Sequence, residues 1–382
     1  CRQWILSWDG VNRGATPLYA LPGLAAQLGV HQVWLKDESV RSKLGSFKAL
    51  GAPIALACLI LRHRPDRQFE PAGLFSGQYR SELQDFTVIS ATDGNHGRSL
   101  AAAAQSIGCQ CVIVLHAQVS QEREDAIAAY GARIVRIAGN YDESVAEAAR
   151  LAQQHRWEVV SDTSYEGYEE IPRDVMQGYG VLAAEVVQDL SPSGQGTCPF
   201  SHVVLQGGVG GMAAGLLSYF WERYGAQRPQ VIIAEPAQAD CLYQSARAGA
   251  PAKATGSVDS VMAGLACGET SPLAWRFLHT GADYFMTIED SDAIEAMRVL
   301  AHGANGDVPV VAGESGAAGL AALQVLLASP DLAAQAQLNA GSRILLINTE
   351  GATAPALYQQ LLGEGAESVL ARQEAWKSRA AA

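Results

Sequence analysis

The alternation of short β-branched runs with alanine-rich stretches limits most strongly how this chain can fold. From about Phe86 onward an apolar run, a turn and a helical stretch follow one another repeatedly. The apolar runs of this first series are FTVIS, CQCVIVLHA, RIVRIAG and WEVVSDT. This order is typical of βαβ units, in which helices connect and cover parallel strands. The pattern therefore predicts a small parallel sheet flanked by helices.

A second series of apolar runs begins after a long helical segment, Ile171 to Leu190, and the polar linker SPSGQGTCP. Its members are SHVVLQGG, QVIIAEP, DYFMTIE and RILLINTEG, separated by helical stretches. A further run near the N-terminus, HQVWLKDES, can join either sheet. Because 382 residues exceed one typical domain, we expect an α/β protein with two sheets.

The charge balance and the cysteine content narrow the class of partner and the compartment. The formal net charge is -12, whereas nucleic acid or an anionic membrane would require clustered Lys and Arg. The uncharged apolar run from Leu50 to Leu61 is too short to span a bilayer. Seven cysteines in so long a chain are no disulfide framework, and the sequence shows no secretory n-region followed by an apolar segment. We therefore expect a cytoplasmic protein with a small-molecule partner, no nucleic acid and no membrane.

A glycine-rich loop from Gln206 to Gly215, QGGVGGMAAG, follows a predicted strand and opens a predicted helix. Glycines let the backbone turn sharply and bring N–H groups near a phosphate, and the helix dipole favours negative charge there. The loop lacks the spacing and the lysine of a Walker A motif. It predicts a phosphate-binding cup, and a tight turn without a ligand is the alternative.

Lys48 lies in KDESVRSKLGSFKALGA, two residues after Ser46 and at the expected start of a helix. Its apolar neighbours would exclude water from the amine, which lowers the pKa of a lysine and makes it a candidate for a Schiff base. A solvated lysine near a helix start is the alternative, and Lys36 and Lys43 compete for the role.

The stretch FTVISATDGNHGRSLAAAA runs from a strand through a turn into a helix, and the turn carries Asp93 and Asn95. A Schiff-base lysine, a glycine cup and a strand–turn–helix with an asparagine are the parts needed to hold pyridoxal phosphate. In the order SFKALGA, SATDGNHG and GGVGG, these segments resemble the fold-type II pyridoxal-phosphate enzymes, the group of tryptophan synthase β and threonine dehydratase. Within that group, KDES, ATDGNHGR, DTSYEGYEEIPRDVMQGY, AGESGAAG and INTEGAT resemble the diaminopropionate ammonia-lyases.

The resemblance covers nearly the whole chain and implies a fold. It implies two open, twisted, mostly parallel sheets flanked by helices, with the active site between the domains. A large cofactor-binding domain would comprise residues 1–81 and 187–382, and a small substrate or lid domain would comprise residues 82–186. Since the relatives are usually homodimers, the resemblance also implies a homodimer.

The resemblance assigns roles in binding pyridoxal phosphate. Lys48 would carry the cofactor as a Schiff base, and Asn95 would hydrogen-bond its O3′. Thr349 would offer a hydroxyl to the pyridine nitrogen, a role for which Asn348 and Thr353 compete. A neutral partner at that nitrogen tempers the electron sink and suits elimination over transamination. The phosphate would rest on the backbone amides of Gly207, Gly208, Val209, Gly210 and Gly211.

The activity that the resemblance implies is α,β-elimination of D- and L-2,3-diaminopropionate to pyruvate and two ammonia. The enantiomers present the α-proton on opposite faces, so two bases are useful. The resemblance assigns Asp93 to the D-substrate and Asp162 to the L-substrate; a turn or N-cap role is the alternative for Asp162. One departure is Gly45-Ser46 before the Phe-Lys pair, where the lyases have Asn-Ala and the dehydratases tend to have serine.

Two other functions are kept as alternatives. A serine or threonine dehydratase, or another β-eliminating or β-replacing enzyme, would use the same cofactor without needing the carboxylate of Asp93. A non-catalytic Rossmann-like ligand-binding module would not need Lys48.

The remaining candidates are side chains that can contact the substrate or form a lid. The loop SYEGYEEIP is expected to act as the lid because of its position and aromatic content. His96 can equally pack beside its turn, and Glu314 and Ser315 can equally cap the following helix. Cys241 and Cys267 can reach the rim of the site and are expected as thiols, and no spacing predicts a metal. These weaker substrate or lid candidates are Ser46, Thr92, His96, Tyr168, Glu314 and Ser315.

Overall fold

The computed structural model describes residues 2–92, 94–139, 141–191 and 196–380. Asp93, one of the two expected bases, lies outside the described residues. The contacts divide the chain into two units, each assembled from segments that are distant in sequence. The first unit comprises Cys1–Ala15 and Arg41–Val181, and the second comprises Thr16–Val40 and Leu182–Ala382.

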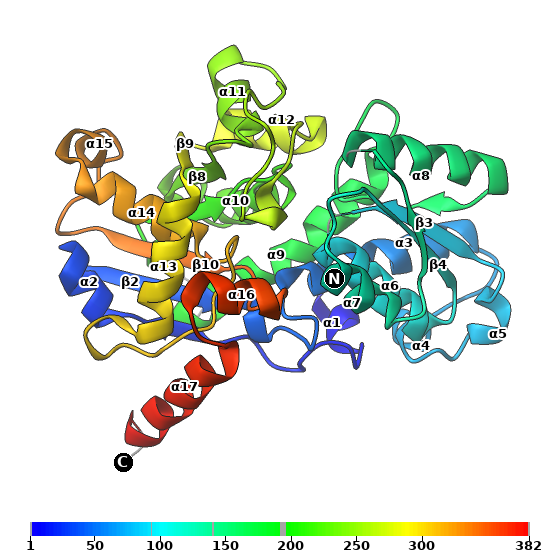
Figure 1. The fold of residues 1–382 in the computed structure, drawn as a ribbon, viewed down its shortest axis with the longest axis horizontal. Helices are drawn as coiled ribbons and strands as arrows, with labels where there is room; N and C mark the ends of the chain where they lie inside the picture. The colour runs from blue at the N-terminus through cyan, green and yellow to red at the C-terminus, as the bar shows by residue number, and fades with distance from the viewer. Residues whose placement is uncertain (1, 93, 140, 192–195, 381–382) are drawn as a thin grey trace. The chain divides into compact units, whose positions relative to one another are not determined.

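The first unit is built on a four-stranded parallel sheet with the order β5-β4-β3-β6 (Figure 1). Its strands are β3 (Thr87–Ala91), β4 (Gln110–Leu115), β5 (Arg133–Arg136) and β6 (Glu158–Val159). They coincide with the apolar runs of the first series, so the predicted small parallel sheet is confirmed.

Helices cover this sheet because consecutive side chains of β3 and β4 are apolar and point to opposite faces, so both faces have to be buried. Ile89 and Val112 pack in one core with Ala148 of α8 (Tyr141–His155). The alanine-rich α6 (Asn95–Ile107) packs against β4 and α3. The other α-helices that lie wholly within this unit are α1 (Arg2–Leu6), α3 (Ala52–His63), α4 (Pro71–Phe75), α5 (Arg80–Leu83) and α7 (Gln121–Ala128).

The second unit has a six-stranded sheet with the order β1-β2-β10-β7-β8-β9. Its strands are β1 (Leu18–Ala20), β2 (Gln32–Asp37), β7 (His202–Gln206), β8 (Gln230–Pro236), β9 (Tyr284–Ile288) and β10 (Arg343–Asn348). The second series of runs forms β7 to β10, and HQVWLKDES joins this sheet because β2 pairs in parallel with β10. The antiparallel edge strand β1 was not predicted, since its three residues show no periodicity. The α/β fold with two mostly parallel sheets is therefore confirmed.

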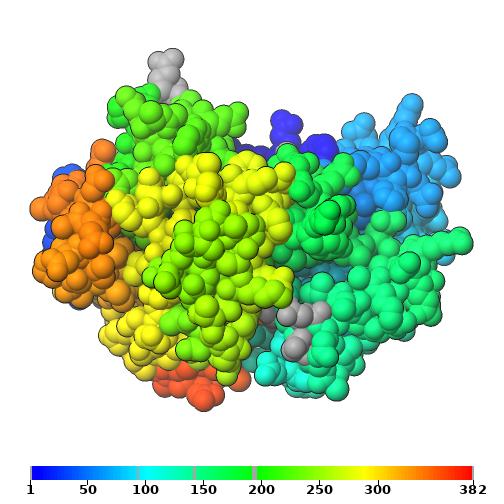
Figure 2. All heavy atoms as spheres, turned by 90° about the horizontal axis from the view of Figure 1, so that it is seen from above, coloured from blue at the N-terminus to red at the C-terminus, as the bar shows by residue number. Residues whose placement is uncertain are grey.

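Apolar helices cover the second sheet as well (Figure 1). Helices α13 (Asp290–His302) and α14 (Ala318–Ala328) share a core with Ile232 and Leu346 of the sheet, and α10 (Gly211–Tyr224) packs against β7. The remaining helices are α2 (Pro22–Leu28), α11 (Cys241–Ala248), α12 (Pro272–Gly281), α15 (Pro330–Gln335), α16 (Pro355–Leu362) and α17 (Ala366–Ala380). In Figure 2 the lime to yellow residues around α11 and α12 lie on the surface that faces the viewer. None of the described helices combines the length and hydropathy that a bilayer span needs.

The contact units have other boundaries than the expected domains, residues 1–81 with 187–382 and residues 82–186, and that domain division stays a prediction. Residues 1–15 and 41–81 belong to the first unit, because α3 packs against α6. The later boundary falls after Val181, inside α9 (Glu170–Leu190), and not after residue 186. The N-terminal part of the chain is thus shared between the units.

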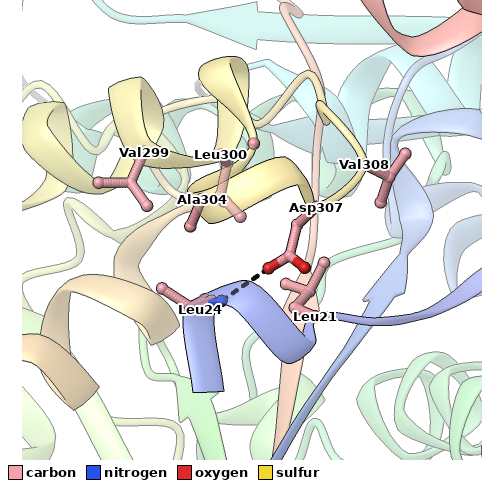
Figure 3. A pocket seen from close by; sticks show the side chains of 8 residues that line it. Leu21, Leu24, Val299, Leu300, Ala304, Asp307 and Val308 are labelled. Atoms are coloured by element: carbon pink, nitrogen blue, oxygen red, sulfur yellow. Dashed lines mark hydrogen bonds between the residues drawn. The ribbon is translucent and has the colours of Figure 1, made fainter. Parts of the chain in front are cut away.

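A small apolar pocket of the second unit is part of its packing (Figure 3). At its edge, Asp307 accepts hydrogen bonds from the backbone N–H groups of Gly23 and Leu24, at 2.8 and 2.7 Å. These groups lie in the first turn of α2, where they have no partner within the helix. The pocket is lined by Leu21, Leu24, Val299, Leu300, Gly303, Ala304, Asp307 and Val308. It contains none of the predicted site residues.

A fully buried ion pair joins α9 to the second sheet. Lys36 Nζ lies 2.8 Å from Glu185 Oε2 and donates to the Thr16 carbonyl at 2.7 Å. Thr16 in turn donates its N–H to Glu185 and its hydroxyl to Glu38. A buried charge is tolerated when it is paired and hydrogen-bonded in this way. Lys36 therefore has a structural partner and is a poor competitor for Lys48.

We predict that Lys36→Met lowers the free energy of unfolding by about 3–5 kcal/mol, because it leaves the charge of Glu185 buried and unpaired. Chemical denaturation of the purified variant measures this loss. Lys253→Met is the matched control, since Lys253 pairs with Glu269 at the surface and exposed pairs contribute little. Equal losses in the two variants would contradict the structural role of the buried pair.

Candidate active site

Lys48 lies on a short 3-10 turn, Phe47–Leu50, directly before α3. Its Nζ lies 5.2 Å from the ring centre of Phe47 and 5.8 Å from that of Tyr179, and 18% of its side chain is exposed. The amine thus has the apolar flanks that the sequence indicated. One of them, Tyr179, comes from α9 and was not predicted.

A close backbone approach holds this turn against α9. A Cβ on Gly178 would lie 2.0 Å from the Leu50 carbonyl oxygen, and a Cβ on Gly51 would lie 2.6 Å from the Tyr179 ring. A side chain at position 178 would require the backbone to move, and one at position 51 would displace the Tyr179 ring. The glycines therefore fix where the Lys48 side chain leaves the chain.

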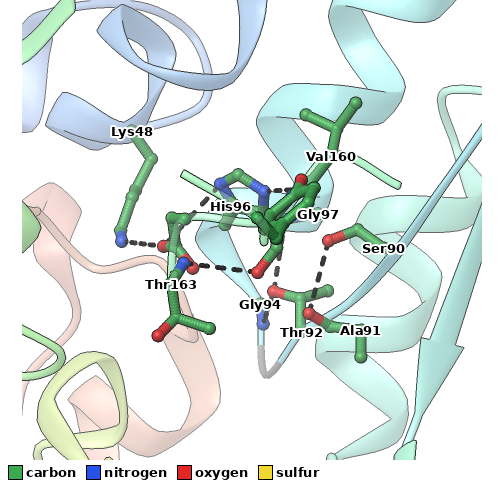
Figure 4. A network of polar contacts seen from close by, with 12 residues as sticks. Lys48, Ser90, Ala91, Thr92, Gly94, His96, Gly97, Val160 and Thr163 are labelled. Carbon is green, nitrogen blue, oxygen red and sulfur yellow. Dashed lines mark hydrogen bonds and ion pairs between the residues drawn. The ribbon is translucent and has the colours of Figure 1, made fainter. Parts of the chain in front are cut away.

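Asp162 follows β6 at the carboxyl end of the first sheet, the edge at which ligands of open α/β sheets collect. Its Oδ2 lies 2.6 Å from Lys48 Nζ (Figure 4). Burial alone would raise the pKa of Asp162, but the charge of Lys48 and then that of His96 lower it well below its usual range. Asp162 is therefore ionised at neutral pH. It caps no helix, since α9 begins only at Glu170.

His96 contacts the same carboxylate from α6. Its Nε2 lies 2.9 Å from the Val160 carbonyl oxygen, so Nε2 carries a proton, because a carbonyl only accepts. Its Nδ1 faces Asp162 Oδ2 at 3.7 Å. The side chain is buried, with 3% of its surface exposed. His96 is therefore packed in the interior and also contacts the candidate base Asp162.

The start of α6 is held by a neighbouring hydroxyl. Thr92 Oγ1 accepts hydrogen bonds from the N–H groups of Gly94 and Gly97, each at 3.2 Å. The hydroxyl of Thr92, a weaker substrate candidate, therefore stabilises the turn. Asn95, the expected partner of the cofactor's O3′, is the first residue of α6.

Ser46 has a buried hydroxyl close in sequence to Lys48. The residue is 1% exposed, and its Oγ has no hydrogen-bond partner among the described residues. An unsatisfied buried hydroxyl is costly unless a ligand or water completes its bonding. This position therefore fits a polar group of a bound molecule.

The glycine loop between β7 and α10 contains two glycines in the left-handed backbone region. Gly208 and Gly210 have φ values of +65° and +98°, which favour glycine. A Cβ on Gly210 would lie 2.9 Å from Leu278 Cδ1, whereas the nearest atoms around Gly208 lie at 3.4 Å or beyond. Gly207 donates its N–H to the Ala234 carbonyl at 2.9 Å, so this amide belongs to the sheet.

The other amides of the loop fit the expected phosphate. In the described turns and loops no backbone hydrogen bond engages the N–H of Gly208 or Val209. Gly210 donates to Gly207 at the long distance of 3.3 Å, and Gly211 begins α10. The loop and the orphaned Ser46 hydroxyl are thus separate features that each fit part of pyridoxal phosphate or of its substrate.

The end of β10 separates the three candidates for the pyridine nitrogen. Asn348 Nδ2 donates to Asp37 at 2.8 Å and to the Val311 carbonyl at 3.0 Å. The hydroxyl of Thr353 donates to Glu350 at 3.4 Å. Thr349, directly after the strand and 3% exposed, is therefore the best candidate of the three.

Glu314 and Ser315 are buried in the loop before α14. Ser315 Oγ accepts from the Gly264 N–H at 3.0 Å, while the N-cap position of α14 is held by Ala317. Ser315 therefore joins two loops and does not cap the helix.

A glutamate behind the glycine loop was not predicted. Glu235, at the end of β8, accepts from the N–H groups of Leu242 and Tyr243 at 2.9 and 2.7 Å. Burial raises its pKa to about 8. A Cβ on Gly207 would meet its Cγ at 2.6 Å, so Glu235 supports the loop from behind. The sequence could have indicated this residue, because it is an acid inside the apolar run QVIIAEP, where a buried carboxylate needs hydrogen-bond partners.

The cysteines and acidic groups form no further site in the described part of the chain. Cys241 and Cys267 are both thiols, and Cys241 Sγ lies 3.5 Å from the Gly208 carbonyl oxygen. No group of three or more His, Cys, Asp or Glu side chains among the described residues is placed to hold a metal ion.

Comparisons with known proteins agree with this arrangement. The family model described as "Pyridoxal-phosphate dependent enzyme" matches residues 11–350. Diaminopropionate ammonia-lyase of Escherichia coli K12 is 41% identical over 93% of this chain and 88% of its own length. The Salmonella typhimurium enzyme of that name is 37% identical over 93% of this chain and 89% of its own length.

A solved structure extends the similarity to three dimensions. The Escherichia coli enzyme in complex with an aminoacrylate-PLP azomethine reaction intermediate has a TM-score of 0.85 and 39% identity. The match covers 96% of this chain and 92% of that one. This chain therefore belongs to the family of pyridoxal-phosphate dependent enzymes and, within it, to the diaminopropionate ammonia-lyases.

Proposed function

We propose that this chain catalyses the α,β-elimination of D- and L-2,3-diaminopropionate, which with one water gives pyruvate and two ammonia. The Lys48–Asp162 pair carries the proposal. The lysine expected to hold the cofactor has a carboxylate at 2.6 Å, where a base is required. The names of the similar enzymes supply the substrate.

The resemblance names the groups that would hold the cofactor. Lys48 would bind it covalently, Asn95 would hydrogen-bond O3′, and Thr349 would contact the pyridine nitrogen. Its phosphate would lie on the amides of the loop from Gly208 to Gly211. When bound, pyridoxal phosphate withdraws electrons from the α-carbon of an attached amino acid and so makes the α-proton acidic.

Asp162 would accept that α-proton from one face, and Asp93 from the other. While Lys48 is charged, it keeps the pKa of Asp162 low and the carboxylate is a weak base. Any step that removes the charge of Lys48 removes the larger of the two charges that lower this pKa, so the pKa of Asp162 rises and its carboxylate becomes a stronger base. The charge state of Lys48 would thus control the basicity of Asp162.

Three further features belong to the proposal. The loop SYEGYEEIP would act as a lid, and the enzyme would be a cytoplasmic homodimer. The described cysteines, which are all thiols, support a reducing compartment. The resemblance to the ammonia-lyases supports the other two.

A second candidate is elimination from serine or threonine with the same cofactor. The orphaned hydroxyl of Ser46 favours it, because the dehydratases tend to have serine at this position, before the Phe-Lys pair. The substrate assay below separates the two functions.

We expect pyruvate from both enantiomers of diaminopropionate and much slower release from serine and threonine. A coupled assay for pyruvate, run on the holoenzyme with each amino acid, measures the four rates. Faster turnover of serine or threonine than of either diaminopropionate enantiomer would contradict the proposed substrate.

We expect Lys48→Ala to lose covalent attachment of the cofactor while Lys43→Ala keeps it. Borohydride reduction of the loaded protein followed by mass spectrometry measures the attachment, since only an amine bound to the cofactor retains it after reduction. Retention in Lys48→Ala would assign the role to another lysine.

We expect Asp93→Asn to impair the D-substrate more, and Asp162→Asn the L-substrate more, by about 100-fold or more in each case. An asparagine keeps the shape of the side chain but cannot accept the proton. The rates of both variants with both enantiomers measure the pattern, and equal losses for the two substrates would refute a division between two bases.

A further inference from the structure

The segment that carries Asp162 is held by the sheet only as far as Val160. Strand β6 has two residues, Glu158 and Val159, and the ladder with β3 ends where the Val160 N–H donates to Ile89 at 2.9 Å. Asp162 lies beyond that point. Its position must therefore come from contacts other than the sheet.

The hydroxyl of Tyr168 supplies such contacts on both sides of Val160. It donates to the Val159 carbonyl at 2.9 Å and accepts from the Ser161 N–H at 2.9 Å. One side-chain atom thus satisfies a backbone acceptor and a backbone donor that flank a single residue. Burial raises the pKa of this hydroxyl, so it keeps the proton that it donates.

His96 holds the residue between them, since its Nε2 bonds the Val160 carbonyl (Figure 4). The backbone from Val159 to Ser161 is therefore tied to two side chains immediately before Asp162. A carboxylate whose oxygen must stay 2.6 Å from Lys48 Nζ depends on such a fixed backbone.

A tight turn fixes Tyr168 itself. Tyr165 and Tyr168 exchange backbone hydrogen bonds, and their rings stack with centres 4.7 Å apart. Gly167 between them has a φ of +79°, which the turn requires. The ring of Tyr168 is thus held without its hydroxyl, so removing that one atom need not displace the ring.

We propose that Tyr168 is a positioning residue for Asp162 and not a substrate contact of the lid. Its hydroxyl fixes the backbone that sets Asp162 against Lys48, and turnover through Asp162 depends on it. This inference rests on the proposed function, in which Asp162 serves one enantiomer and Asp93 the other. The second enantiomer therefore serves as an internal control.

The test compares Tyr168→Phe with Tyr165→Phe, which removes the hydroxyl of the stacked neighbour. In Tyr168→Phe, kcat should fall about tenfold or more for whichever enantiomer Asp162→Asn impairs more, with a smaller change for the other. Tyr165→Phe should leave the ratio of the two rates as in the parent enzyme. An equal fall for both enantiomers, or no fall, would overturn the proposal.

A second measurement does not depend on turnover. Amide hydrogen exchange at Ser161, in the protein with and without pyridoxal phosphate, should be about tenfold faster in Tyr168→Phe, as expected when one hydrogen bond is lost. Unchanged exchange would overturn the proposal. If the parent enzyme released no pyruvate from diaminopropionate but exchange rose as expected, the proposed function would fail while the positioning of this backbone would stand.

Discussion

A charged amine in apolar surroundings needs a negative partner, and the ion pair of Lys48 and Asp162 meets that need at the first sheet. The partners lie 114 residues apart in the sequence, so the pair forms only when the turn that carries Lys48 and the segment that carries Asp162 are both correctly placed. Glycine at position 178 lets the turn that carries Lys48 approach α9, and the end of β6 presents Asp162 from the other side. The same pair links the basicity of Asp162 to Lys48. A charged Lys48 opposes the effect of burial and keeps the pKa of Asp162 low, and a neutral Lys48 would let that pKa rise.

Local periodicity was enough to predict most of the fold. The β-branched runs became the strands of two sheets, and the glycine-rich loop became the turn from β7 into α10, because these features are encoded within a few residues. The edge strand β1 is too short to show a period. The division into contact units cannot be read from local patterns. It depends on the packing of α3 against α6, and the sequence of α3 does not indicate which helix it packs against.

The site was predictable only in part, for the same reason. Lys48 and the glycine loop have local sequence signals, and Asp162 was assigned through resemblance. Nothing near Tyr179 indicates that its ring flanks Lys48, and nothing near Tyr168 indicates that its hydroxyl holds the backbone of β6. These contacts join segments that are separated in sequence or depend on one turn geometry. A local pattern of residue types carries no information about them.

The strand order of the second sheet has a consequence for synthesis on the ribosome. β10 lies between β2 and β7, and Asn348 at its end bonds Asp37, 311 residues earlier. At a translation rate of about 5–20 residues per second, β10 is synthesised about 15–60 s after β2. The first sheet is complete once β6 has emerged, so the nascent chain would hold one finished sheet and one divided sheet. A product that stopped before β10 would lose the centre of the second sheet, and with it the connection between β2 and all the strands from β7 to β9.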